Sequence, residues 1–162
     1  IKISVGDILS LKKNYKPNNV SESSPGNAYT SYSINKGEKI VFCLRQKSGP
    51  NKDQLVDLNT MMFVAIHELA HLMSKSIGHT TEFWDNMRFL LEKGIELGIY
   101  EHVNYSKKPE DYCGIKITDT PLTKNTTNNK KNNKSNKEEE SNKEDESNKE
   151  DKSNKEDKSN KK

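Results

Sequence analysis

Residues 63–84 of the chain read FVAIHELAHLMSKSIGHTTEFW, and this stretch decides the expected fold and site. It contains the pattern H-E-x-x-H, formed by His67, Glu68 and His71. On a helix, side chains four positions apart lie on one face, roughly 6 Å from each other, so both imidazoles can bind one Zn²⁺ ion. Glu68 points in a different direction from His67 and can act as a general base on a water molecule. The pattern therefore predicts a helix that carries two zinc ligands and a base.

A catalytic zinc ion usually has three protein ligands, and we expect the third shortly after this helix. His79 is the first choice, because Gly78 before it can adopt the left-handed conformation in which a chain reverses. Glu82 is an alternative ligand, and its other possible role is to complement the dipole of a following helix. The spacing excludes the metzincin pattern, whose glycine and third histidine would fall at Ser74 and Ile77.

Two further alternatives for the metal site stay open at this point. A pattern with a downstream glutamate ligand would use Glu92 or Glu96, and Cys113 would cap the ion as a thiolate. Phe83 and Trp84 are expected in the core of the domain.

The patterns around the histidines predict a small α+β domain in which a β-hairpin or sheet packs on a central, largely apolar helix. Turn-forming residues at 35–38 separate two segments that are rich in β-branched and aromatic residues. The expected elements are a helix over 5–14, a loop over 16–27, hairpin strands within 29–34 and 39–45, a helix from 55 or 59 to 76, a helix from 80 or 81 to about 97, and a short strand within 114–118.

The end of the chain has a different composition from the rest. Residues 123–162 contain no hydrophobic residue, and from residue 135 they repeat the pattern SNKE with a period of six. Without apolar side chains to bury, nothing offsets the entropy that ordering would cost. We therefore predict a folded domain over 1–122 and a disordered, low-complexity tail over 123–162. An interaction tail or a nucleic-acid tether is the alternative interpretation of this segment.

Composition excludes several classes of protein. The chain has 27 Lys and Arg against 24 Asp and Glu, which is too balanced for a dedicated nucleic-acid-binding domain. The longest apolar run, 61–66, is too short to span a membrane. Two cysteines do not make a disulfide-rich scaffold, so a reducing compartment fits, with a single Cys43–Cys113 bridge left open. We expect an intracellular protein of the host-cell cytoplasm or nucleus, although a targeting segment before Ile1 stays open.

The central stretch resembles the WLM/SprT-like zinc metallopeptidases, which share H-E-L-x-H, a short link and then G-H-x-x-E/D-F. The matching residues here are His67, Glu68, Leu69, His71, Gly78, His79, Glu82 and Phe83. Over about residues 28–118 the chain is also similar to WLM-type proteins of large DNA viruses. The resemblance implies a minigluzincin-like fold, one Zn²⁺ ion on His67, His71 and His79, and Glu68 as the base. Cellular members of the group cleave proteins crosslinked to DNA, which implies DNA-associated proteins as substrates.

The predicted function is that of a zinc-dependent metalloendopeptidase acting on a protein or peptide substrate. The alternative is a catalytically silent, zinc-stabilised binding or scaffold domain. An extended substrate needs a strand edge to pair its backbone, and the strand directly before the metal helix is our choice for that edge. Its expected substrate-binding residues are Ile40, Val41, Phe42 and Cys43. Candidates for stabilising the oxyanion are Tyr100, His102 and Tyr112.

Overall fold

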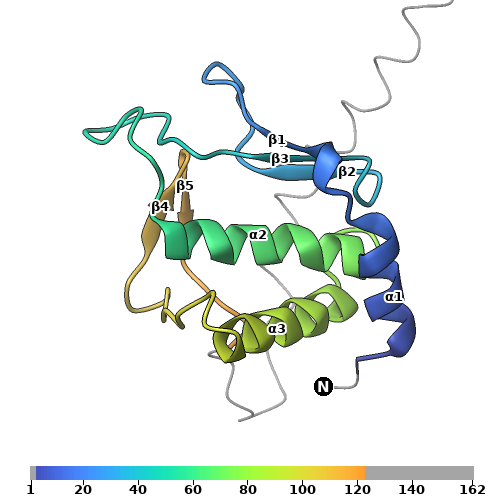
Figure 1. Ribbon diagram of the computed structural model, residues 1–162. Helices are drawn as coiled ribbons and strands as arrows, with labels where there is room; N and C mark the ends of the chain where they lie inside the picture. The colour runs from blue at the N-terminus through green and yellow to red at the C-terminus, as the bar shows by residue number, and fades with distance from the viewer. Residues whose placement is uncertain (1–2, 123–162) are drawn as a thin grey trace, which may run out of the picture. The chain divides into compact units, whose positions relative to one another are not determined.

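The computed structural model describes residues 3–122 of the chain (Figure 1). The predicted tail, 123–162, lies outside the described residues. The first element is helix α1, Val5–Asn14, which has the bounds expected from the sequence. Its start is fixed by a reciprocal pair of hydrogen bonds, in which the Asp7 N–H donates to the Ser4 hydroxyl and the Ser4 N–H donates to the Asp7 carboxylate. Such a capping box satisfies two backbone donors that the first helical turn leaves unpaired.

A small sheet follows α1 in the chain. It contains β1 (Val20–Glu22), β2 (Tyr32–Ile34) and β3 (Lys39–Phe42), in the order β1-β3-β2. The predicted hairpin is confirmed, since β2 and β3 pair antiparallel. Its turn has three consecutive residues at positive φ, Asn35, Lys36 and Gly37, and this left-handed course is the one that tight hairpins favour.

The sheet differs from the sequence prediction in one respect that matters for function. Residues 20–22, expected to be part of a loop, form β1 and pair parallel with 40–42 of β3. β3 is therefore the internal strand of the sheet and has a partner strand on each side. The prediction that this strand offers a free edge to a substrate is wrong. The neighbouring strands already use the backbone of Ile40, Val41 and Phe42, and the Cys43 N–H donates to the Ser31 hydroxyl.

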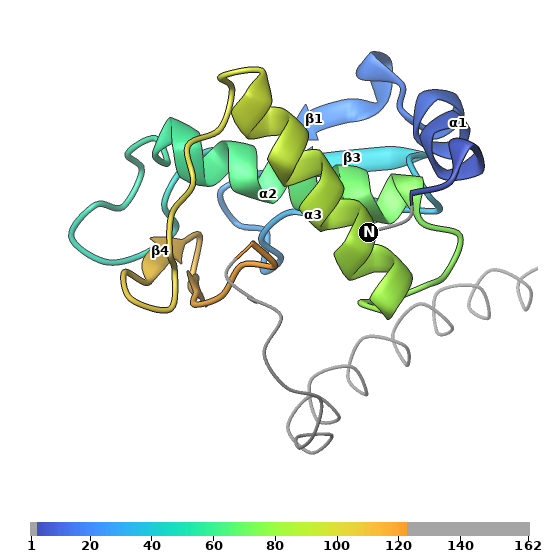
Figure 2. The same ribbon diagram turned by 90° about the horizontal axis from the view of Figure 1, so that it is seen from below.

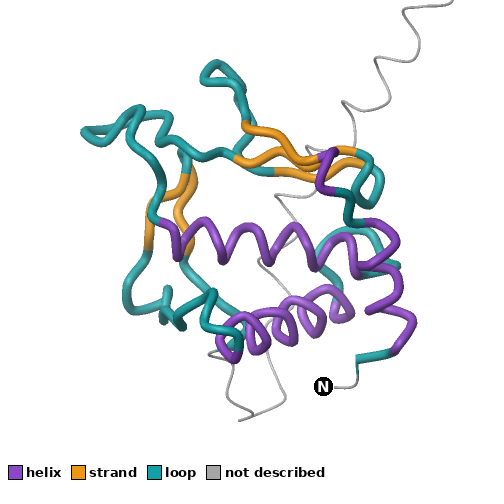
Figure 3. Tube along the Cα trace, viewed as in Figure 1, coloured by secondary structure: helices purple, strands orange, loops and turns teal. Residues whose placement is uncertain are grey.

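Two long helices form the rest of the scaffold. Helix α2, Leu58–Met73, lies between the sheet and helix α3, Thr81–Glu96, as Figures 1 and 3 show. The view from below shows α3 crossing the face of α2 opposite the sheet (Figure 2). α2 begins and ends close to the predicted bounds, and its N-cap Asp57 accepts a hydrogen bond from the Thr60 N–H at 2.9 Å. α3 begins after its N-cap Thr80, one of the two threonines at which the sequence placed its start.

The core lies between these helices and a C-terminal hairpin. This hairpin consists of β4 (Glu110–Tyr112), which the sequence analysis missed, and β5 (Ile115–Ile117), within the predicted 114–118. Cys43 and Cys113 form a disulfide bond that joins the end of β3 to the turn of the hairpin. The bridge that the sequence left open is therefore the arrangement in the structure. The buried cluster includes Phe63, Ile66, Phe83, Met87, Leu91, Tyr100, Tyr105 and Tyr112.

Candidate metal centre

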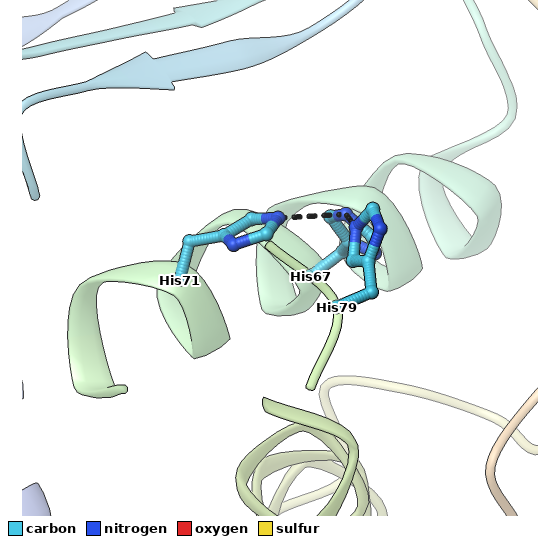
Figure 4. A group of neighbouring side chains, drawn as sticks. All are labelled: His67, His71 and His79. Carbon is cyan, nitrogen blue, oxygen red and sulfur yellow. Dashed lines mark hydrogen bonds between the residues drawn. The ribbon is translucent and has the colours of Figure 1, made fainter. Parts of the chain in front are cut away.

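Three histidine side chains converge on one point of the α2 surface. The Nε2 atom of His67 lies 3.2 Å from Nε2 of His71 and 3.1 Å from Nε2 of His79 (Figure 4). One nitrogen from each ring lies within 4.8 Å of the other two. His67 and His71 are half-buried on successive turns of α2, and His79 is exposed on the connection to α3. Among the His, Cys, Asp and Glu side chains of residues 3–122, these three histidines form a group that could hold a metal ion together.

The donor set fits a single divalent cation. Three ligands at about 2.0–2.1 Å in a tetrahedral arrangement would place neighbouring nitrogens about 3.3 Å apart, close to the two distances above. Hydrogen bonding explains the cluster less well. One nitrogen of a neutral imidazole offers either one proton or one lone pair, yet His67 Nε2 approaches two other ring nitrogens at once. A cation shared by the three nitrogens satisfies all of them together.

The connection between α2 and α3 brings His79 back over the helix. α2 ends at Met73, three residues before the predicted end, and Gly78 has a φ of 78° directly before His79. The left-handed conformation at Gly78 is the one expected from the sequence, and it is easy only for a residue without Cβ. Without the reversal of the chain in this connection, the third imidazole would not reach the face of α2 that carries the other two.

An aromatic side chain supports the three imidazoles. The ring centroid of Phe83 lies 4.9 Å from that of His67, 4.3 Å from that of His71 and 4.7 Å from that of His79. Phe83 is fully buried, which confirms its predicted position in the core. Trp84 was also expected in the core but is 37% exposed, with its ring 5.6 Å from His79. The imidazoles therefore rest on a rigid apolar surface that limits their movement.

Glu68 follows His67 on α2 but is buried, with only 5% of its surface exposed. Its charge acts on Tyr112, whose phenol pKa is raised mainly by burial and further by Glu68. The Tyr112 hydroxyl donates to the Cys43 carbonyl at 2.8 Å and lies 2.5 Å from the Ser31 hydroxyl. Glu68 is therefore a buried carboxylate on the helix of the histidines, close to the region where β3 meets the C-terminal hairpin.

Glu82 has a structural role that the sequence did not reveal. Its carboxylate oxygens accept hydrogen bonds from the N–H groups of Lys75 and Ser76, at 3.0 and 2.9 Å. Hydrogen bonds from the Ser76 side chain and from the two backbone groups lower the pKa of Glu82. Because its carboxylate is used in this way and is not part of the histidine cluster, Glu82 is not the third member of the site.

The remaining candidates from the sequence do not join the cluster. Glu92 pairs with Arg88 and Glu96 with Lys93 on the exposed side of α3. Cys113 is held in the disulfide and has no thiolate to offer. Among the proposed oxyanion donors, Tyr100 and Tyr112 are buried in the core, and His102 is exposed on the segment after α3.

The α+β fold and the three-histidine site define a metallopeptidase-like domain. The model of the WLM domain matches residues 6–162, so the chain belongs to the WLM domain family, which is associated with metallopeptidases. This confirms the resemblance seen in the HELAH and GHTTEF motifs.

Relatives of the chain come from large DNA viruses. Uncharacterized protein R325 of Acanthamoeba polyphaga mimivirus is 39% identical over 102 residues, which is 62% of this chain and 50% of that protein. Uncharacterized protein 042R of Invertebrate iridescent virus 3 is 38% identical over 88 residues, which is 52% of this chain and 50% of that protein. The chain thus spans about half the length of the curated relatives it matches. The resemblance to WLM-type proteins of large DNA viruses is confirmed.

Among solved structures, the crystal structure of Wss1 from Saccharomyces cerevisiae matches with a TM-score of 0.45 and 21% identity. The match covers 56% of this chain and 69% of Wss1. None of the helices within residues 3–122 has the length and apolar character needed to cross a membrane.

Proposed function

We propose that the chain is a zinc-dependent metalloendopeptidase domain that hydrolyses peptide bonds in protein substrates. In this proposal His67, His71 and His79 hold the metal ion, and Glu68 is the general base. The observation that carries the proposal is the convergence of three Nε2 atoms beside a helix that also carries a buried carboxylate. A purely structural site has no use for such a base.

When bound, zinc supplies Lewis acidity, which activates water and polarises the scissile carbonyl. The residues of the chain do the rest. Glu68 accepts a proton from the attacking water and later gives it to the leaving amine. Phe83 keeps the imidazoles in place, so that the reacting groups need little reorganisation.

The edge of the sheet nearest to α2 is the better choice for substrate pairing now that β3 is known to be internal. β2 is an edge strand, with β3 on one side only, and it packs against α2. An extended peptide could pair its own backbone N–H and C=O groups with those at the open edge of β2, in the manner of strand addition. We therefore assign substrate pairing to Tyr32–Ile34 in place of Ile40–Cys43.

The test compares zinc content and cleavage of an unfolded protein substrate for the wild type and three variants. Glu68→Gln should retain zinc and lose about 10²–10⁴-fold in cleavage rate, because only the proton transfer is removed. His67→Ala should lose both zinc and cleavage. Glu92→Gln is the matched control on the exposed face of α3 and should behave as the wild type.

The outcomes distinguish the two functions considered. Full activity in Glu68→Gln would refute the assignment of the base. Bound zinc with no cleavage by the wild type on any unfolded substrate would favour the zinc-stabilised scaffold domain.

The choice of DNA-associated proteins as substrates stays a proposal, tested by comparing the cleavage of one protein with and without single-stranded DNA. The location in the host-cell cytoplasm or nucleus also stays a proposal, and the disulfide bears on it because such bridges persist in oxidising surroundings.

A further inference from the structure

The position of His79 depends on a segment without regular structure. Residues 74–80 connect α2 to α3 and form neither helix nor strand. Ile77, in the middle of this connection, is 84% exposed, so core packing does not hold it in place. Polar contacts of the connection with the elements around it therefore set the course of residues 74–80. This course in turn sets the place where the His79 ring lies.

The first of these contacts comes from Glu82 in the first turn of α3. One carboxylate oxygen accepts from the Lys75 N–H at 3.0 Å and the other from the Ser76 N–H at 2.9 Å. The Ser76 hydroxyl also lies 2.6 Å from that of Thr80, the residue after His79. Two-point binding by one carboxylate fixes both the distance and the orientation of the connection relative to α3.

The second contact comes from Lys36, far away in sequence. It lies in the turn between β2 and β3, and its ammonium group donates to the carbonyls of His71 and Ser76. The His71 carbonyl belongs to the last turn of α2, where carbonyl groups have no partner within the helix. Lys36 thus ties the end of α2 to the connection through the Ser76 carbonyl, whereas Glu82 binds the Ser76 N–H.

We propose that Lys36 and Glu82 form a clamp on the α2–α3 connection and act as positioning residues that hold His79 in place to complete the metal site. This inference rests on the proposed function, in which His79 is the third ligand. The two charged groups approach the same residue, Ser76, one through its N–H and one through its C=O. Both the N–H and the C=O of Ser76 are therefore held in place, three residues before His79.

The test uses the full chain and Co²⁺ as the probe, because its visible absorption reports the number and geometry of the ligands. Glu82→Gln replaces one acceptor oxygen by an NH₂ group that cannot accept a hydrogen bond, and Lys36→Met keeps the length of the stem without the donor. Each should weaken Co²⁺ binding about 10–100-fold, as the loss of groups that orient metal ligands does. Each should also shift the absorption spectrum toward that of His79→Ala.

Two controls and one double variant separate positioning from general destabilisation. Glu92→Gln and Lys39→Met make the same exchanges at exposed positions on α3 and β3 and should leave the Co²⁺ affinity unchanged. In the His79→Ala background, Glu82→Gln should cause no further loss, because its effect passes through His79. A merely structural role would weaken binding equally in both backgrounds. Lys36→Arg, which keeps the donors, should restore the wild-type spectrum.

The results that would overturn the clamp differ from those that would overturn the proposed function. Wild-type affinity and spectrum in Glu82→Gln and Lys36→Met, with altered binding in His79→Ala, would refute the clamp alone. The clamp would also be refuted if Glu82→Gln lowered the Co²⁺ affinity equally in the wild type and in the His79→Ala background. Unchanged binding in His79→Ala, or no Co²⁺ binding by the wild type, would instead refute the proposed metal site.

Discussion

Replacing Gly37 by alanine should destabilise the domain strongly, because the hairpin turn presses against α1 at this residue. A Cβ atom at this position would lie 2.4 Å from the backbone oxygen of Asn14 and 3.1 Å from Cδ2 of Leu72. Relieving such an overlap requires a backbone shift, which costs about 1–3 kcal/mol. The φ of 107° adds about 1–2 kcal/mol of conformational strain for a residue with a side chain. We therefore expect a loss of about 2–5 kcal/mol in the free energy of unfolding.

The assay is urea unfolding followed by circular dichroism, with Gly49→Ala as the matched control. Gly49 also has a positive φ, of 78°, but a Cβ there would meet nothing within 4 Å. Its replacement should cost only the strain, about 1–2 kcal/mol, so the difference between the two variants isolates the steric overlap. Equal losses in the two variants would refute the claim that the turn is tightly packed against α1.

Three further predictions concern the stability of the domain, two from single contacts and one from buried phenols. Asp57→Ala should lower the free energy of unfolding by about 1 kcal/mol, because α2 loses its N-cap, whereas Asp57→Asn, which keeps an acceptor oxygen, should change it little in the same urea assay. Asn86→Ala should lower it by about 1–3 kcal/mol, because the buried amide donates to the Ser74 hydroxyl at 3.0 Å between α2 and α3; a loss below that of Asp57→Ala would contradict this. Three buried phenols have raised pKa values, caused mainly by burial: Tyr100, Tyr105 and Tyr112. Since the unfolded chain ionises them above about pH 10 while the folded domain keeps them protonated, stability should be retained below that pH and fall as the pH rises beyond it; tyrosinate absorbance that reaches the value of the unfolded protein before unfolding begins would contradict this.

The sequence predicted the parts of the fold whose signals are local. α2 and α3 have long periodic patterns of apolar residues, and α3 starts at Thr80, one of the two predicted starting positions. The convergence of His67, His71 and His79 was also predictable, because all three lie within 13 residues and only one chain reversal separates them. Such short-range geometry depends on helical spacing and on one glycine, and both can be recognised in a sequence.

The features that the sequence did not reveal depend on contacts between distant segments. β1 consists of Val20–Glu22, a polar stretch that becomes a strand only because β3 offers it a partner. The internal position of β3 follows from this pairing, so the choice of the substrate edge had to change. Likewise, nothing in the sequence around Lys36 indicates that its side chain reaches the carbonyls of His71 and Ser76.

The bond between Cys43 and Cys113 spans 70 positions of sequence, and the segment it closes contains α2, α3 and the three histidines of the candidate metal site. A single backbone cut anywhere inside that ring would leave two pieces that stay covalently linked. Nicked molecules would run as one band on a non-reducing gel and separate into two only after a thiol is added. Cleavage between residues 43 and 113 would therefore be invisible to a size measurement made without a reductant.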